Sequence, residues 1–211
     1  MVALVLMVLA STMIYITFAS VTRAWRRATK LAEDLHHGDF IMDQLVLGLR
    51  SAYFPDAGKG VKGYGFWLED GGSGAGAADS ISWVKQGSAL TASNSPVVAG
   101  PHRIQFAVME DETGRNAPAV RYWRPYGQTE NFDPSSLEFQ FLSSRVRGFD
   151  CRIATNMTSG EWIWSDVWEN DDTNRLPQAV ELTLFLDPLE PDGEPIQVRR
   201  YVEIPVWRLS R

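Results

Sequence analysis

The sequence predicts an α+β fold in which one long N-terminal helix, a membrane anchor continued by an amphipathic stem, packs on antiparallel β-sheets. Apolar side chains recur at helical spacing through the N-terminal part, and no proline occurs before Pro55. After Pro55 the apolar residues alternate with polar ones, which is typical of strands. The chain therefore divides into a predicted anchor at 1–22, a stem at 23–54 and one β-rich globular head at 55–211.

The N-terminal segment Met1–Thr22 contains no charged residue, no proline and no glycine. A helix needs about 20 apolar residues to cross the hydrocarbon of a bilayer. Two alternatives fit less well: a signal peptide has basic residues before its apolar core, and a core helix of a chain this size is seldom uncharged throughout. We therefore predict a transmembrane or polymerisation helix. Its predicted packing residues are Leu4, Leu6, Val8, Leu9, Ile14, Ile16 and Phe18.

Helical spacing of apolar residues continues through the stem at 23–54. Gly38 falls within this pattern and predicts a kink or interruption, because glycine costs a helix about 1 kcal/mol relative to alanine. Pro55, followed by Gly58, predicts the end of the helix. The stem residues predicted to pack against the head are Leu35, Met42, Leu45 and Leu49.

Beyond Pro55 the sequence contains a series of candidate strands joined by short polar loops, which predicts antiparallel pairing. The pattern is clearest near the C-terminus, where apolar residues alternate from Val180 to Leu186 and a turn-rich link follows from Asp187 to Pro195. The predicted strands are Val61–Glu69, Ser80–Lys85, His102–Glu110, Ala119–Tyr126, Leu137–Ser143, Val146–Ala154, Glu161–Val167, Gln178–Asp187 and Gln197–Trp207.

The distribution of charge argues against a nucleic-acid partner. The 211 residues carry 20 basic and 26 acidic side chains. Four of the basic side chains lie in the first thirty residues, which hold no acid: Arg23, Arg26, Arg27 and Lys30. The remaining residues carry 16 basic and 26 acidic side chains, a formal net charge of −10. Nucleic-acid phosphates require a basic surface, and an acidic head lacks that property.

Tryptophan and cysteine usage predicts packing rather than chemistry. Most of the 8 Trp are expected in the core, and an aromatic sugar-binding platform on the Trp-rich strand at Glu161–Val167 is the alternative. The single Cys151 cannot form an internal disulfide, and we expect it to be a small buried side chain.

No cofactor site is expected. Gly71–Ala78 contains a match to the dinucleotide-binding fingerprint, but that motif requires a following helix, and a strand pattern follows instead. A flexible hairpin loop is therefore predicted. His36 and His37 are adjacent on the stem helix and point about 100° apart, which disfavours a shared metal ion. His102 has no accompanying nucleophile motif, so we predict no enzymatic activity.

A cluster of acids after the Trp-rich strand is a weak calcium candidate. Calcium sites need several oxygen ligands that converge from a turn, and the spacing here does not match an EF-hand. We predict a solvated acidic loop without a metal. The residues of this cluster are Asp166, Glu169, Asp171 and Asp172.

Parts of the chain resemble the type IV pilin superfamily and, within it, the minor pseudopilin J of type II secretion systems. Met1–Leu6 is similar to the segment directly after the processing motif of these proteins. Gly160–Trp168 and Arg175–Leu184 are similar to the family's tryptophan-bearing strand and the Leu-Pro-X-Ala-Val segment that follows it. The basic leader, the processing glycine and the glutamate of the family motif are absent from this chain, and we expect the true start to lie upstream of Met1.

The resemblance implies a pilin-like fold and a structural subunit near the tip of the pseudopilus that supports protein export. It implies a single-pass protein of the bacterial inner membrane with its head in the periplasm, and a place in the pseudopilus after assembly. The implied partners are the I-type and K-type minor pseudopilins, together with a prepilin peptidase that cleaves and methylates the chain if a leader exists.

Two alternative functions remain open from the sequence. One is a minor pilin of a type IV pilus or a DNA-uptake system, which would share the same helix. The other is a membrane-anchored carbohydrate-binding or enzymatic domain, for which the Trp-rich strand is the motive.

Overall fold

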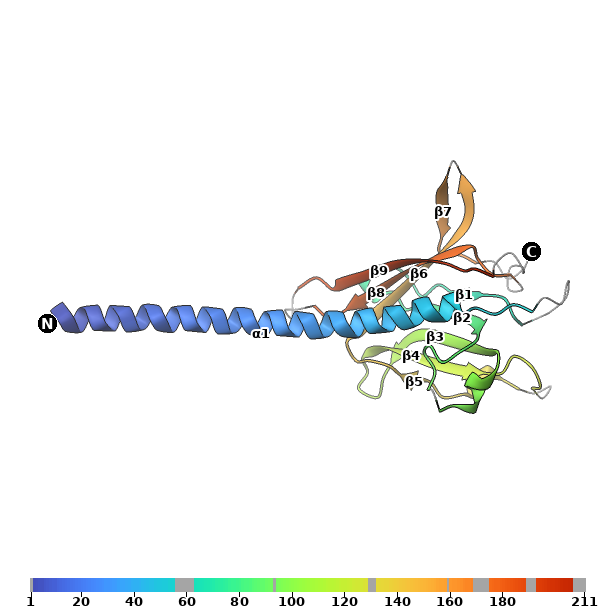
Figure 1. Cartoon of the computed structure of the whole chain (residues 1–211), viewed down its shortest axis with the longest axis horizontal. Helices are drawn as coiled ribbons and strands as arrows, with labels where there is room; N and C mark the ends of the chain where they lie inside the picture. Colours follow the sequence, from blue (N-terminus) through green and yellow to red (C-terminus); the bar gives the residue numbers. More distant parts are fainter. Residues whose placement is uncertain are drawn as a thin grey trace.

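A computed structural model shows one long helix, α1 (Val2–Arg50), followed by two antiparallel β-sheets. In Figure 1 the N-terminal part of α1 projects beyond the sheets, and its C-terminal part lies alongside both of them. Side chains of the helix are described at residues 7, 11–26, 28–29 and 38–50. The structure describes residues 2–55, 63–92, 94–128, 132–158, 160–168, 175–188 and 193–206.

The first sheet has the strand order β1-β2-β3-β4-β5, and each neighbouring pair is antiparallel. This order follows the chain, as expected when short loops join successive strands. The strands are β1 (Trp67–Glu69), β2 (Ser80–Lys85), β3 (His102–Glu110), β4 (Asn116–Trp123) and β5 (Gln140–Phe141). Short 3-10 helices in the connections are η1 (Gly74–Gly76), η2 (Pro96–Ala99) and η3 (Pro134–Ser136).

The second sheet has the strand order β7-β6-β8-β9, again with antiparallel pairs. Its central strand β6 is long and is shared by two partners. The half from Val146 to Ile153 pairs with β8, and the half from Ile153 to Thr158 pairs with β7. The β6–β7 hairpin therefore projects past β8 (Figure 1). The strands are β6 (Val146–Thr158), β7 (Glu161–Ser165), β8 (Ala179–Leu186) and β9 (Ile196–Glu203).

Each predicted strand overlaps an observed one, and the bounds of β2 and β3 are those predicted. The largest difference is at β1, which is shorter than the predicted Val61–Glu69. The backbone before β1 has another hydrogen-bond partner, because the carbonyl groups of Gly63 and Gly65 accept hydrogen bonds from the side chain of Arg103.

The fold class predicted from the sequence, a long membrane-anchor helix packed on antiparallel sheets, is wrong. The head is built from two antiparallel sheets, and the described part of α1 that packs on them runs only from Gly38 to Arg50. Within the residues that the structure describes, no helix is both long and apolar enough to cross a membrane. Within the predicted stem at 23–54, the described residues 23–26 are exposed, whereas side chains between Ile41 and Leu49 lie in the core. Helical spacing in a sequence does not reveal how far along the helix a sheet extends.

Gly38 does not kink or interrupt α1, contrary to the prediction. It allows the helix to approach the second sheet, because a Cβ there would lie 2.7 Å from Cδ2 of Leu186 on β8. Gly48 has a similar role against the first sheet, where a Cβ would lie 3.0 Å from Cζ2 of Trp83. The indole Nε1 of Trp83 donates a hydrogen bond to the Gly48 carbonyl over 2.9 Å. Two glycines thus position the helix against both sheets.

The glycine-rich segment from Gly71 to Asp79 joins β1 to β2, as predicted, but it is held in place by the second sheet rather than being a free loop. The Phe149 amide on β6 donates to the Ala77 carbonyl over 2.9 Å, and the Asp79 amide donates to the Phe149 carbonyl over 3.1 Å. The Asp79 carboxylate accepts hydrogen bonds from the amides of Gly71 and Cys151. Burial raises the pKa of Asp79 to about 6. This segment therefore connects the two sheets.

Lys85, at the end of β2, is a fully buried cation. Its Nζ donates a hydrogen bond to the Gly87 carbonyl over 2.7 Å, and burial lowers the pKa of Lys85 to about 8. Between this value and the ordinary lysine pKa of about 10.4, the unfolded chain binds more protons than the folded chain. Lys85 therefore destabilises the fold at pH 7, and this cost decreases as the pH rises above about 8.

We expect Lys85→Met to raise the free energy of unfolding at pH 7, by on the order of 3 kcal/mol at most. The gain over the wild type should shrink between pH 8 and 10. Chemical denaturation at several pH values measures it. The buried Cys151 thiol, whose pKa burial raises, has the opposite pH dependence, but its contribution cancels in the difference between the two proteins. A difference that stays constant with pH would contradict this expectation.

Candidate assembly interface

The projecting part of α1 carries large apolar side chains on all sides. Each of these side chains is between 59% and 74% exposed, and none of the described ones lies in the hydrophobic core. Soluble monomers rarely leave a contiguous apolar surface of this kind uncovered, and such surfaces mark interaction sites. The exposed residues are Met7, Met13, Ile14, Tyr15, Ile16, Phe18, Val21 and Trp25.

Four polar side chains in this segment donate hydrogen bonds within the helix itself. Thr17, Thr22 and Thr29 each donate a hydroxyl hydrogen bond to the carbonyl four residues earlier, over 2.8 to 3.1 Å. Arg23 Nε donates to the Ala19 carbonyl over 3.2 Å. A hydroxyl bonded in this way does not require water, so these threonines are compatible with an apolar environment. The segment is thus suited to being covered by an apolar partner.

A second exposed apolar pair lies on the packed part of the helix. Phe40 and Leu47 are 59% and 53% exposed, whereas Met42, Leu45 and Leu49 are fully buried. Residues seven apart on a helix lie within about 20° of each other. Phe40 and Leu47 therefore share the face that points away from the core.

Beside Phe40, the helix and the first sheet enclose a groove of ≈ 560 Å³. Ile41 and Gln44 of α1 form one side of it, and Leu90 and Leu142 form the other. The Leu90 amide donates to Gln44 Oε1 over 3.2 Å, which ties the loop after β2 to the helix. The exposed face of α1 is therefore continuous with a groove in the head.

The structure places the predicted packing residues in three settings. Ile14, Ile16 and Phe18 are exposed on the projecting helix. In contrast, Met42, Leu45 and Leu49 lie in the core with both sheets. The side chains of Leu4, Leu6, Val8, Leu9 and Leu35 lie outside the described residues.

Sequence reasoning did not identify Phe40, Leu47 or the adjacent groove. The available signal was the seven-residue spacing of Phe40 and Leu47, which sets them apart from the core stripe of Ile41, Leu45 and Leu49. The groove itself also requires Leu90 and Leu142, and their approach to the helix depends on the fold of the first sheet.

Only one residue of the weak calcium candidate lies within the described part of the chain. Asp166 Oδ1 accepts a hydrogen bond from Arg152 Nε over 3.0 Å at the surface. The other candidates, Glu169, Asp171 and Asp172, lie outside the described residues. The part of the chain that is described contains no group of three or more metal-ligating side chains.

His102 has structural partners. Its Nδ1 lies 2.9 Å from the Gly100 carbonyl, its Nε2 lies 3.4 Å from Thr91 Oγ1, and burial lowers the pKa of His102. The side chains of His36 and His37 lie outside the described residues. The buried Cys151 thiol lies in the core, in agreement with the prediction.

No family model, curated protein or solved structure matches the chain.

Proposed function

We propose that this chain is a minor pseudopilin, a structural subunit that supports protein export by a type II secretion system near the tip of the pseudopilus. The observation that supports this proposal best is the apolar helix that projects from the head (Figure 1), with largely exposed side chains such as Ile16 and Phe18. An apolar helix of this kind gains stability when the helices of neighbouring subunits cover it. Its work is packing, and we propose no catalytic role.

The proposed partners are the I-type and K-type minor pseudopilins. Before assembly the chain would reside in the bacterial inner membrane with its head in the periplasm, and a prepilin peptidase would process it if a leader exists. The similarity of Gly160–Trp168 and Arg175–Leu184 to segments of the J-type family supports this choice of system. The exposed Phe40 and Leu47 extend the apolar helix face toward the head, where a partner's head would lie.

Phe18→Asp tests the proposal in a strain whose own copy of the gene is deleted. A carboxylate in an apolar helix interface costs several kcal/mol, so we expect export to fall by roughly tenfold or more. Phe18→Leu is the matched control, since it keeps an apolar side chain and should restore export. Secreted protein in the culture medium is the measurement, with immunoblots for the amount of each variant.

Phe18 lies outside the core, so the variant head should keep its melting temperature. Normal export by Phe18→Asp at the wild-type protein level would contradict the proposed interface. If the deletion strain exports normally but loses pili or DNA uptake, the chain is a minor pilin of that system instead.

A further inference from the structure

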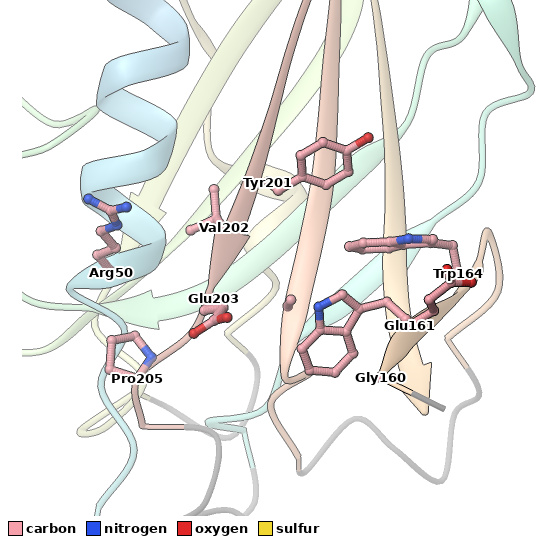
Figure 2. Close-up of a pocket in the computed structure, with 10 residues that line it drawn as sticks. Arg50, Gly160, Glu161, Trp164, Tyr201, Val202, Glu203 and Pro205 are labelled. Atoms are coloured by element: carbon pink, nitrogen blue, oxygen red, sulfur yellow. The ribbon is translucent and has the colours of Figure 1, made fainter. Parts of the chain in front are cut away.

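A second groove lies at the C-terminal end of α1, away from the projecting segment (Figure 2). Its volume is ≈ 930 Å³, within the ~300–1,000 Å³ that small-molecule sites occupy. Trp164 of β7 lies across from Glu203 of β9, Tyr201 lies between them, and Arg50 lies at the end of the helix (Figure 2). Trp162 of β7 also lines the groove. The groove would stay accessible when the projecting helix is covered.

The groove follows from the strand pairing of the second sheet. Strand β8 begins at Ala179, opposite Glu203 of β9, whereas β6 and β7 continue to pair as far as Thr158 and Glu161. Among the described residues, no strand continues β8 between β6 and β9 at this end of the sheet. Ala179 and Val202 are buried and lie among the lining residues, beneath the aromatic walls.

The aromatic side chains of the groove face solvent rather than the core. Trp162 and Trp164 are two residues apart on β7, so they lie on the same face of the strand. The rings of Trp164 and Tyr201 contact each other, with centroids 5.6 Å apart and planes inclined at 45°. Tyr201 is 60% exposed, and among the described residues the core cluster includes none of these three rings. They form a partly exposed aromatic platform.

Charged planar groups border this platform. Glu161 and Glu203 supply carboxylates, and Arg50 supplies a guanidinium group, and all three side chains are exposed. Carboxylates accept hydrogen bonds and guanidinium donates them, so the rim can satisfy a ligand with both donors and acceptors. An apolar floor, flat rings and a few polar groups match a molecule with one C–H face and a polar edge.

We propose that this groove binds a neutral oligosaccharide. The apolar C–H face of a sugar ring stacks on Trp162 and Trp164, and its hydroxyl groups bond to Glu161, Glu203 and Arg50. A cationic ligand is the competing occupant, since Glu161 and Glu203 attract it and Arg50 repels it. This proposal does not depend on the assembly role of the projecting helix.

The test is binding of the detergent-solubilised full chain to an array of neutral oligosaccharides that includes chitotriose, cellotriose and maltotriose, followed by calorimetric titration with the best binder. We expect saturable binding that Trp164→Ala weakens by roughly tenfold or more, about 1.4 kcal/mol. Tyr201→Ala should weaken it too. Trp25→Ala is the matched control, since Trp25 is an exposed tryptophan on the distant helix and its loss should leave binding unchanged.

Glu203→Gln separates a neutral sugar from a cation. The amide retains a hydrogen-bonding oxygen, so sugar binding should fall only a few-fold, whereas binding of a lysine-rich peptide would be lost with the charge. Thermal unfolding of each variant verifies that the head is folded. The proposal is overturned if no oligosaccharide on the array binds, if Trp164→Ala binds as the wild type does, or if a lysine-rich peptide binds and Glu203→Gln abolishes that binding.

Discussion

Replacement of Arg103 by alanine should lower the free energy of unfolding by about 3 to 5 kcal/mol. Arg103 lies on β3 and is only 2% exposed. Its Nη2 donates to the carbonyl groups of Gly63 and Gly65 over 2.8 and 2.9 Å, and its Nη1 donates to Ser82 Oγ over 3.0 Å. The guanidinium carbon also lies 4.4 Å from the centroid of the Trp67 ring. The alanine variant would leave a large cavity and unbonded acceptors around it.

Arg121→Ala is the matched control for this experiment. Arg121 lies on β4 of the same sheet, stacks 4.4 Å from the Phe139 ring centroid and donates from Nε to Gln105, but it is partly exposed. Water can replace these contacts, so we expect a loss of about 1 kcal/mol or less. Arg103→Lys should fall between the two, because one ammonium cannot reproduce the planar fork of guanidinium. Equal destabilisation by Arg103→Ala and Arg121→Ala in urea would contradict the structural role.

The burial of Arg103 was not predictable from the sequence. It follows His102 at the start of a strand and looks like an ordinary polar position of an alternating pattern. Its partners at Gly63 and Gly65 lie about forty residues earlier, and only the pairing of β1 with β2 and of β2 with β3 brings them together. Local alternation determines where a strand lies, whereas burial of a charge depends on these distant pairings.

The helix shows the same difference between features that local sequence predicts and features that depend on distant contacts. Helical periodicity placed Met42, Leu45 and Leu49 on one face, and the structure buries all three. The extent of packing depends on where the sheets end, and the close approach at Gly38 reflects the contact with Leu186 on a strand formed almost 150 residues later. Helix propensity alone predicted a kink at Gly38. The presence of glycine at this position is explained instead by the close approach of the helix to Leu186, which is a tertiary contact.

The aromatic groove could be predicted only in part from the sequence. The alternation of Trp162 and Trp164 marked them as a possible platform, but Tyr201 and Glu203 lie on β9, two strands away from β6 in the sheet order. The opening exists because β8 starts at Ala179 while the β6–β7 hairpin continues. A strand's starting position relative to its neighbours is a property of register, which the turn chemistry and the core together determine.

Gly71→Ala should destabilise the fold by about 3 kcal/mol, because the two sheets are joined where this residue lies. A Cβ at Gly71 would be 2.2 Å from the carbonyl oxygen and 2.3 Å from the carbonyl carbon of Ala78, which are backbone atoms that cannot rotate away. Relief of this clash must move the segment that bonds to Phe149 of β6. It must also disturb the Asp79 carboxylate, which bonds the Gly71 and Cys151 amides.

Gly76→Ala separates this backbone clash from a general intolerance of the glycine-rich loop to substitution. Gly76 belongs to the same segment, its φ is not positive, and a Cβ there would meet nothing within 4 Å. Alanine at this position reduces the freedom of the unfolded chain, so stability should stay the same or rise by about 0.4 to 1 kcal/mol. Urea denaturation of the two variants measures the difference. If both were equally stable, the contact of Gly71 with Ala78 would not hold the sheets together, and the loop would be the flexible hairpin that its composition predicts.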